Sequence, residues 1–369
     1  MKKQKPVDFW VLMTVLILLA FGTIMVFSAS APYAYNYMNG DTYHFLKKQL
    51  QYLPIGLFAM FVMANFDYRK LAKLSPYFFV ISIGLLVLVL IPGIGRVFNK
   101  SRRWFVLAGQ SIQPSEFMKI SLILFFSYSL SSRKDQLKYF FKGLLPYLLV
   151  VGAIAVLLLM EPHFSCAIIV ILVSAILLFC AGAKIKHFVM LSVPVVAALA
   201  SVIIFVDYMR ERALSFLNPF ADPTGDGWQA VQSLYAIGSG GFFGRGLGKS
   251  LQKFLYLPEP YNDFILSVVA EELGFIGVLV VMLLFLIFIW RGVKIAVNAP
   301  DLFGSLVAIG ITALVAVQVI INFAVVTSSV PVTGMPLPFF SYGGTSLILL
   351  LTDVGILLNI SRHADYKRI

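Results

Sequence analysis

The stretch Leu257-Pro-Glu-Pro-Tyr-Asn-Asp-Phe-Ile-Leu-Ser-Val-Val-Ala-Glu-Glu-Leu-Gly-Phe-Ile-Gly277 leads from a polar loop into a long apolar run. Asn262 and Asp263 stand where a helix N-cap belongs, with helix-forming residues directly after them. Glu271 and Glu272 follow inside the apolar run, which continues for several more turns. Acidic side chains at membrane depth are costly and usually mark a functional site. The stretch therefore predicts a membrane helix with a site at its mouth, unless Asp263 serves only as the helix cap.

The composition is that of a membrane protein. Of the 369 residues, 60% are hydrophobic and 12% are charged, which is far more apolar than a water-soluble domain requires. The net charge of +12 would indicate a nucleic-acid partner in a soluble protein. Here the distribution of the basic residues along the loops accounts for the positive net charge, so we expect no nucleic-acid binding. We predict a single membrane domain over residues 1–369.

Apolar runs of spanning length predict an all-α polytopic membrane protein with about ten transmembrane helices. The predicted spans are residues 9–30, 50–66, 77–93, 114–131, 143–161, 164–182, 187–207, 264–290, 304–327 and 345–361. A large extracytoplasmic loop, residues 208–263, is predicted between the seventh and eighth helices.

An even number of spans places both chain ends on the same side of the membrane. The positive-inside rule puts that side in the cytoplasm, because the short loops there are basic. The basic residues of these ends and loops are Lys2, Lys3, Lys5, Arg69, Lys70, Lys73, Arg133, Lys134, Lys138, Lys142, Lys184, Lys186, Arg291, Lys294, Arg362, Lys367 and Arg368. They would face the anionic lipid of the inner leaflet.

The segment between the third and fourth predicted spans is basic although it lies on the predicted outer side. Its cations, Arg96, Lys100, Arg102 and Arg103, are close in sequence to Trp104. Cations beside an aromatic ring suit an anionic headgroup or a pyrophosphate group.

Two charged residues follow at the start of the fourth predicted span. Glu116 and Lys119 are three residues apart, after Pro114 in the first helical turn, and share a helix face. They form either an ion pair with no further role or, as is general at the top of a span, the lining of a cavity. His163 lies in the predicted turn Glu161-Pro-His-Phe-Ser165, where a lone histidine is usually solvated, so we predict no role for it.

The loop 208–263 contains further candidates. Arg210 and Arg212 fall on the polar side of an amphipathic segment. The run Gly238-Ser-Gly-Gly-Phe-Phe-Gly-Arg-Gly-Leu-Gly-Lys249 lacks the spacing of a phosphate-binding P-loop. It predicts flexible backbone that comes close to a ligand, with Arg245 beside it.

The last part of the chain predicts an irregular loop beside the site. Gln318 and Asn322 lie four residues apart on one face of the ninth span, as polar contacts between helices or as cavity lining. The stretch Pro331-Val-Thr-Gly-Met-Pro-Leu-Pro-Phe-Phe-Ser-Tyr-Gly-Gly-Thr-Ser346 is too rich in proline and glycine for a regular helix. Irregular backbone near a membrane must be buried in protein or line a cavity.

Seven motifs occur in a characteristic order. They are Arg103-Trp104, Gln113-Pro-Ser-Glu-Phe-Met-Lys119, Gly244-Arg-Gly-Leu-Gly248, Leu257-Pro-Glu-Pro260, Asp263-Phe-Ile265, Ala270-Glu-Glu-Leu-Gly274 and Pro331-Val-Thr-Gly-Met-Pro-Leu-Pro-Phe-Phe-Ser-Tyr-Gly-Gly344. Together they resemble the SEDS family (shape, elongation, division and sporulation), which comprises FtsW, RodA and SpoVE. The resemblance runs over nearly the whole chain, and the pattern is nearer FtsW and SpoVE.

The resemblance implies a ten-helix fold and the polymerisation of lipid II by glycosyl transfer at the outer face of the bacterial cytoplasmic membrane, for cell division, elongation or sporulation. It also implies a class B penicillin-binding protein as transpeptidase partner. The family's essential acidic residue matches Asp263, and its paired glutamate and lysine match Glu116 and Lys119. Members often have His-Thr where this chain has Tyr261-Asn262, and Pro-Asp-Leu-Gly where it has Pro162-His-Phe-Ser165.

The implied reaction is an inverting attack of a sugar hydroxyl on the anomeric carbon of a lipid-pyrophosphate donor. It needs a base and positive charge for the leaving pyrophosphate. Asp263 is predicted to be the base, or the ligand of Mg²⁺ or Mn²⁺ that neutralises the pyrophosphate. Glu116 and Lys119 are predicted to be catalytic with Asp263: Lys119 would bind phosphate together with Arg103, Arg210 and Arg212, and Glu116 would orient Lys119. The predicted substrate-binding residues are Arg103, Trp104, Arg210, Arg212, Arg245, Ser341, Tyr342 and Gly343.

Two other functions use the same features. A flippase or transporter of the lipid-linked precursor would also need membrane carboxylates and cations for pyrophosphate, but the decisive charges lie near the predicted outer face, not along a path across the membrane. A non-enzymatic scaffold that recruits a transpeptidase would leave Asp263 and Glu116 dispensable.

Overall fold

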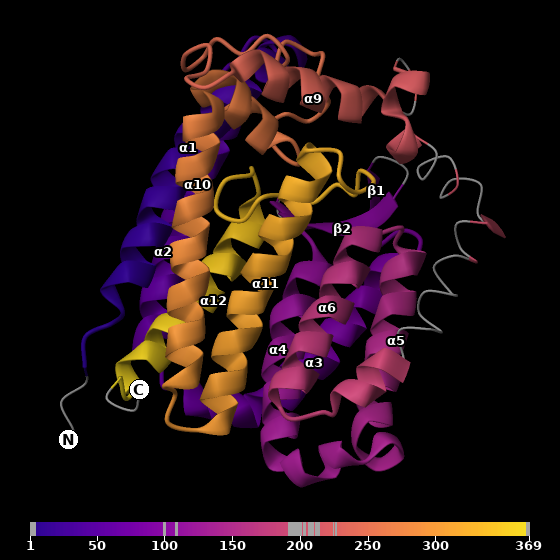
Figure 1. Cartoon of the computed structure of the whole chain (residues 1–369), viewed down its shortest axis with the longest axis vertical. Coiled ribbons are helices and arrows are strands. Elements are labelled where there is room, and N and C mark those ends of the chain that lie inside the picture. The colour runs from indigo at the N-terminus through magenta and orange to yellow at the C-terminus, as the bar shows by residue number, and fades with distance from the viewer. Residues whose placement is uncertain are drawn as a thin grey trace.

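The computed structural model describes residues 5–98, 101–107, 110–190, 201, 204–205, 210, 215–223, 225 and 227–366. Long helices stand side by side along the longest axis of the molecule (Figure 1). Helix α9 (Trp228–Gly240) lies across one end of this bundle, while the start of α1 and the end of α12 lie at the opposite end. We call these the α9 end and the terminal end.

Most of the described elements lie before or after a middle section, residues 181–218. The elements before it are α1 (Phe9–Tyr37), α2 (His44–Asn65), α3 (Tyr68–Leu90), β1 (Arg96–Phe98), β2 (Ser101–Leu107), β3 (Gln110–Ile112), α4 (Pro114–Ser132), a 3₁₀ turn (Lys134–Lys138), a π turn (Phe140–Leu144), α5 (Leu145–Met160) and α6 (Phe164–Cys180). After a 3₁₀ turn (Pro219–Ala221) and α9 come α10 (Ile265–Val297), α11 (Leu302–Val326) and α12 (Gly344–His363).

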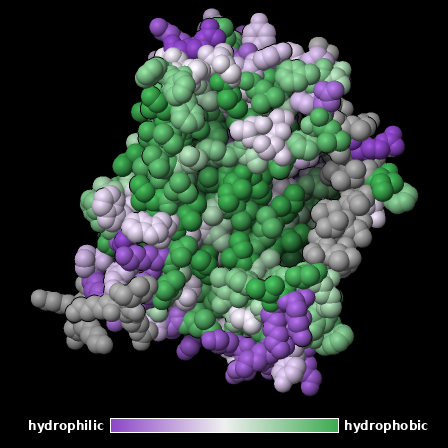
Figure 2. Space-filling model, viewed as in Figure 1, coloured by the Kyte–Doolittle hydropathy of each residue, from purple (hydrophilic) through white to green (hydrophobic). Residues whose placement is uncertain are grey.

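Six of the described helical segments are long and apolar enough to cross a membrane. They are Phe9–Tyr37, Tyr68–Leu90, Phe140–Met160, Ile265–Val297, Leu302–Val326 and Gly344–His363. Hydrophobic side chains cover the visible flank of the bundle, and hydrophilic ones gather toward its two ends (Figure 2). An apolar flank between polar ends matches the cross-section of a bilayer, so the chain is a multi-pass membrane protein.

Helices stand at nine of the ten predicted spans. The remaining one, residues 187–207, lies largely outside the described residues, so the total of ten stays a prediction. The all-α prediction was wrong in one detail, because residues 96–112 contain a small antiparallel sheet in the order β1-β2-β3. This segment is too short and polar to span a membrane, and strand pairing satisfies its backbone hydrogen-bonding groups.

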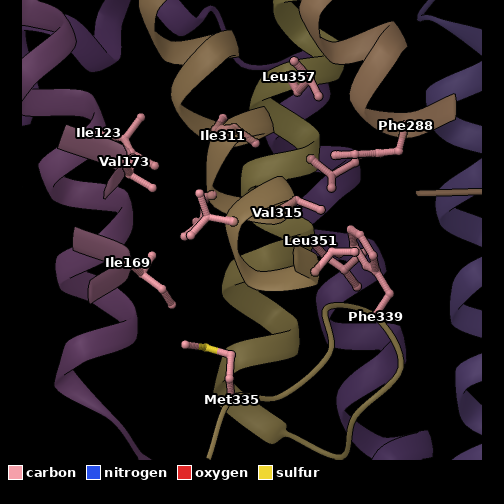
Figure 3. Close-up of a cluster of buried hydrophobic side chains, with 14 of the residues drawn as sticks. Ile123, Ile169, Val173, Phe288, Ile311, Val315, Met335, Phe339, Leu351 and Leu357 are labelled. Carbon is pink, nitrogen blue, oxygen red and sulfur yellow. The ribbon is translucent and has the colours of Figure 1, made fainter. Parts of the chain in front are cut away.

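The core of the bundle runs along both sides of α11 (Figure 3). Buried apolar side chains from α4 and α6 face it on one side, and side chains from α10 and α12 face it on the other. The labelled members are Ile123, Ile169, Val173, Phe288, Ile311, Val315, Met335, Phe339, Leu351 and Leu357. Met335 and Phe339 belong to the loop between α11 and α12, so this loop is anchored in the core.

Helix α10 is broken at Gly274, where φ is +68°. The glycine-rich run before it fills the break: the amides of Arg245 and Gly246 donate hydrogen bonds of 2.9 Å to the carbonyls of Glu271 and Glu272. A Cβ atom at Gly274 would lie 2.3 Å from the amide nitrogen of Gly244. The glycines of this run allow it to approach α10, and its predicted approach to a ligand stays a prediction.

The carboxylate of Glu271 anchors the same loop and does not face the site. It is fully buried and accepts hydrogen bonds from the Ser250 hydroxyl (2.5 Å) and the Leu251 amide (2.8 Å). Arg245, predicted to bind substrate, instead lies 3.6 Å from Glu271 as its ion-pair partner.

Glu272 is the second anchor. It is fully buried and accepts hydrogen bonds from the Gly248 amide (2.9 Å), from Ser28 of α1 (2.7 Å) and from the buried ammonium group of Lys253 (2.6 Å). Of the three carboxylates Asp263, Glu271 and Glu272, only Asp263 is left without such partners among the described residues.

The broken helix leads to a first prediction. Gly274→Ala places a methyl group against the backbone of Gly244 and forces a left-handed backbone conformation on alanine, a strain of about 1–3 kcal/mol before any steric cost. The temperature of thermal unfolding in detergent is expected to fall by several degrees. Gly84→Ala in α3, where a Cβ atom meets nothing within 4 Å, is the matched control and is expected to leave it unchanged or raise it. Equal effects of both substitutions would show that the break is not strained.

Candidate functional site

Three segments meet near the α9 end of the bundle. They are the start of α10, the turn 161–165 between α5 and α6, and the loop 331–343, which we call the proline-rich loop. The hydroxyl group of Ser165 donates a hydrogen bond to the carbonyl of Thr333 and so joins the turn to this loop.

One side chain from α11 joins the proline-rich loop to the start of α10. The side-chain amide of Asn322 donates one hydrogen bond to the carbonyl of Asp263 (2.9 Å) and another to the carbonyl of Met335 (2.6 Å). The prediction that Asn322 makes polar contacts between segments is confirmed. Its position, fully buried in an apolar helix, fixes the backbone of the candidate catalytic residue.

Ser341 and Tyr342 also hold the chain that leads to Asp263. The hydroxyl group of Ser341 donates a hydrogen bond to the carbonyl of Asn262 (2.6 Å), and the amide of Tyr342 donates one to the carbonyl of Tyr261 (2.9 Å). Their sequence motif thus lies beside the site, where these bonds position the backbone before Asp263.

Asp263 is not the cap of α10. The helix begins at Ile265 with Phe264 at the N-cap, and no side chain caps it. The half-buried carboxylate of Asp263 instead faces Gly334 of the proline-rich loop, where an added Cβ atom would lie 3.2 Å from Oδ2. Within the described residues this carboxylate makes no hydrogen bond or ion pair, so it is available to a ligand.

The electrostatic surroundings of Asp263 place its titration near neutrality. Burial, and secondarily the negative charge of Glu259, raise the pKa of Asp263 to about 7, while the nearby cation Arg103 acts in the opposite direction. A carboxyl group that loses its proton near pH 7 has the property expected of a general base.

The turn between α5 and α6 adds a second buried carboxyl group, which the sequence analysis missed. Glu161 is fully buried, and among the described residues neither of its oxygens has a hydrogen-bond partner. Burial raises the pKa of Glu161 to about 8, against the opposing effect of Arg103. The sequence signal that could have identified Glu161 is a glutamate next to a proline at the end of a predicted span.

His163 is buried and not solvated as predicted. Its Nδ1 atom lies 3.2 Å from the hydroxyl oxygen of Ser115. Burial, together with the cations Arg103 and Lys119, lowers the pKa of His163 to about 3, so the ring is neutral at pH 7. It fills the space between the turn and the start of α4.

Glu116 and Lys119 form the predicted pair. Lys119 Nζ lies 2.7 Å from Glu116 Oε1, and both side chains line a small cavity of about 40 Å³ beneath the proline-rich loop. Gln318 of α11 and Asp353 of α12 also line it. Sequence reasoning missed Asp353, although an aspartate in a predicted span was the same signal that singled out Asp263.

The remaining residues that were predicted to bind substrate lie in different parts of the fold. Arg103 and Trp104 lie on β2, where Arg103 Nε donates a 2.8 Å hydrogen bond to Ser101, and Gly343 occupies the N-cap of α12. Arg210 is exposed, and Arg212 lies outside the described residues. The fold therefore brings Arg103 to Asp263 and leaves Arg245 with Glu271.

The predicted divalent cation would need ligands among the side chains of this site. In the described part of the chain, no three aspartate, glutamate, histidine or cysteine side chains converge on a metal-sized site. Mg²⁺ commonly uses one or two protein carboxylates and completes its shell with phosphate oxygens and water. The unpaired carboxylate of Asp263 fits such a shared site.

Comparisons with known proteins agree over the whole length. The family model of the cell cycle proteins FtsW, RodA and SpoVE matches residues 9–366. Stage V sporulation protein E of Bacillus subtilis is 46% identical, with 99% of each chain covered, and a probable peptidoglycan glycosyltransferase FtsW of Geobacter sp. is 41% identical, with 98% of each covered.

Two solved structures share the fold. A chain of a peptidoglycan synthase complex that coordinates polymerisation and crosslinking superposes with a TM-score of 0.81 at 30% identity, covering 96% of this chain and 98% of that one. The rod shape determining protein RodA of Thermus thermophilus gives a TM-score of 0.70 at 27% identity, covering 96% and 97%.

The raised pKa values of Asp263 and Glu161 predict a pH-dependent stability. Each native carboxyl group binds its proton more tightly than the unfolded chain does, so stability is lost as pH rises from about 4 through the native pKa values of about 7 and 8. Asp263→Asn and Glu161→Gln remove this loss. Each variant is expected to unfold at least ~2 °C above the wild type at pH 8.5 and close to it at pH 4.5.

The measurement is thermal unfolding in detergent at both pH values. Asp135→Asn, at an aspartate whose side chain is 99% exposed, is the control and is expected to follow the wild type. An Asp263→Asn protein no more stable than the wild type at pH 8.5 would contradict the burial of that charge.

Proposed function

Since the chain belongs to the FtsW, RodA and SpoVE family of cell cycle proteins, we propose that it is a peptidoglycan glycosyltransferase that polymerises lipid II into glycan strands for cell-wall synthesis. The observation that carries this proposal is Asp263. Its carboxylate lies at the mouth of α10 against the proline-rich loop, has a pKa near 7, and has no partner among the described residues.

The proposed orientation puts the α9 end outside and the chain termini in the cytoplasm. Basic side chains at the terminal end support it, since Arg291 pairs with Asp8 and Arg69 with Asp301 where α10 ends and α11 begins. Lipid II would then present its pyrophosphate and sugars near Asp263, at the outer face of the bacterial cytoplasmic membrane.

The proposed chemistry joins two sugars by inversion. The hydroxyl oxygen of the acceptor sugar forms a bond to the anomeric carbon of the donor, while the bond from that carbon to the lipid pyrophosphate breaks. Asp263 accepts the proton of the hydroxyl group, and the leaving pyrophosphate keeps the electron pair of the broken bond.

Positive charge is needed where the pyrophosphate leaves. Arg103 lies within electrostatic range of Asp263, and its guanidinium group suits phosphate oxygens. If Asp263 also holds Mg²⁺ or Mn²⁺, the ion would supply further charge for the pyrophosphate. Lys119 is already paired with Glu116 in the cavity, which supports a role for this pair in keeping the floor of the site in place.

A class B penicillin-binding transpeptidase is the proposed partner. One structural relative belongs to a complex that coordinates polymerisation with crosslinking, and this chain matches 98% of that relative. The names FtsW and SpoVE among the relatives support a role in cell division or sporulation.

The decisive experiment is polymerisation of fluorescent lipid II by the purified chain with Mg²⁺ or Mn²⁺, with and without a class B partner. Asp263→Ala is expected to lower the rate by about 10²–10⁴-fold, the usual contribution of a general base. Asp135→Asn is the control and is expected to retain wild-type activity.

Each alternative function has its own outcome. Full polymerisation by Asp263→Ala would exclude the base role. Transport of lipid II across a sealed bilayer without any polymer, even with the partner, would identify a flippase. Neither activity, together with retained stimulation of the transpeptidase by both proteins, would identify a scaffold.

The neighbour of Asp263 provides a further prediction. Because the negative charge of Glu259 helps to raise the pKa of Asp263, Glu259→Gln is expected to lower that pKa. The ascending limb of kcat/KM for polymerisation, expected near pH 7 in the wild type, should move to lower pH in this variant. An unmoved limb would mean that another group sets it.

A further inference from the structure

A buried carboxyl group that the proposed chemistry does not use lies in the membrane part of the fold, in the cavity that also contains the Glu116–Lys119 pair. Asp353 is near the middle of the 20-residue helix α12 and only 3% exposed. Its Oδ1 atom has no hydrogen-bond partner among the described residues, and its side chain lines the cavity beneath the proline-rich loop. An unpaired charge in such surroundings is strongly unfavourable, so an ionised Asp353 requires a counter-ion.

The protein groups that line the cavity provide only part of that counter-charge, because Lys119 attracts Asp353 electrostatically but forms its ion pair with Glu116. Lys119 is the one cation in the described lining, and its ammonium group is already 2.7 Å from Glu116. Tyr342 is the remaining titratable group there. Two carboxylates and one ammonium group leave the cavity with a formal net charge of −1 when all three are ionised.

The rest of the lining suits a small cation. Besides the carboxylates, it contains the side-chain amide of Gln318 and the hydroxyl groups of Ser341 and Ser346. Oxygen atoms are the ligands that hard cations prefer, and a group of them next to an unpaired carboxylate is unsuited to phosphate.

We propose that Asp353 binds one monovalent cation, a sodium ion or a proton, which neutralises the cavity. With the cation bound, Lys119 stays with Glu116. Without it, Asp353 competes with Glu116 for the same ammonium group, and the floor of the proline-rich loop loosens. The proposal concerns a site within the membrane and does not depend on the glycosyltransferase activity.

The first arm of the test detects sodium. The unfolding temperature of the purified full-length protein is measured at pH 8.5 in sodium chloride and in choline chloride of equal ionic strength. A ligand that binds only the native state stabilises it by RT ln(1 + [L]/Kd), so bound sodium raises the unfolding temperature as its concentration rises. Asp353→Asn should abolish this response.

The second arm detects a proton. Dicyclohexylcarbodiimide reacts with protonated carboxyl groups in apolar surroundings, and peptide mass spectrometry distinguishes Asp353 from the buried Glu161. Labelling of Asp353 at pH 6–7 that falls as pH rises, without an effect of sodium, would identify the proton. Labelling suppressed by sodium but not by choline would identify the ion.

Glu116→Gln separates this proposal from a merely structural role of Asp353. It removes the competing carboxylate, leaves Lys119 to pair with Asp353, and should abolish both the sodium response and the labelling although Asp353 is present. The proposal is overturned if the wild type shows neither response, or if Glu116→Gln keeps the wild-type response. Asp135→Asn, on the surface, should behave as the wild type.

Discussion

Backbone that leaves a helix inside a membrane protein must find its hydrogen-bond partners within the protein. Asn322 meets this requirement at the site, because its single side-chain amide bonds the carbonyl of Asp263 and that of Met335. The proline-rich loop is too rich in proline and glycine for a regular helix, and without this bridge the carbonyl of Met335 would lose the donor that Asn322 supplies. The same amide therefore makes the irregular loop possible and holds the candidate base in position. The identity of one side chain in an apolar helix thus decides where the chemistry can take place.

The buried carboxylates of the protein fall into two groups. Glu271 and Glu272 are saturated by backbone amides, hydroxyl groups and Lys253, so they stabilise the contact between the glycine-rich run and the broken helix. Asp263, Glu161 and Asp353 lack such partners among the described residues. Unpaired buried carboxyl groups reduce stability, and proteins keep such groups mainly where function needs them. Whether a carboxylate has hydrogen-bond partners therefore distinguishes the two groups better than its position in the sequence does.

Residues from three segments surround the carboxylate of Asp263. Arg103 comes from a strand, Glu259 from the loop before α10, and the facing Gly334 from the proline-rich loop. None of these segments is a membrane helix, yet each is anchored to one by buried contacts. Such an arrangement would let the proposed polar reaction take place at the edge of the bilayer while apolar helices carry the fold.

The sequence by itself determined the membrane class, most of the helix positions and the Glu116–Lys119 pair, because hydrophobic periodicity and residue spacing are local properties. It also singled out Asp263, whose role stays a prediction. Only the tertiary structure decided which carboxylates have hydrogen-bond partners. Glu271 and Asp263 both looked like acidic residues of a membrane helix with a functional site, and their difference lies in the amides that the loop before α10 supplies to Glu271. Burial of Glu161 and Asp353 likewise depends on helices far away in sequence. The physical reason is that the groups around a charge in space stabilise or destabilise it. The whole fold determines which groups those are.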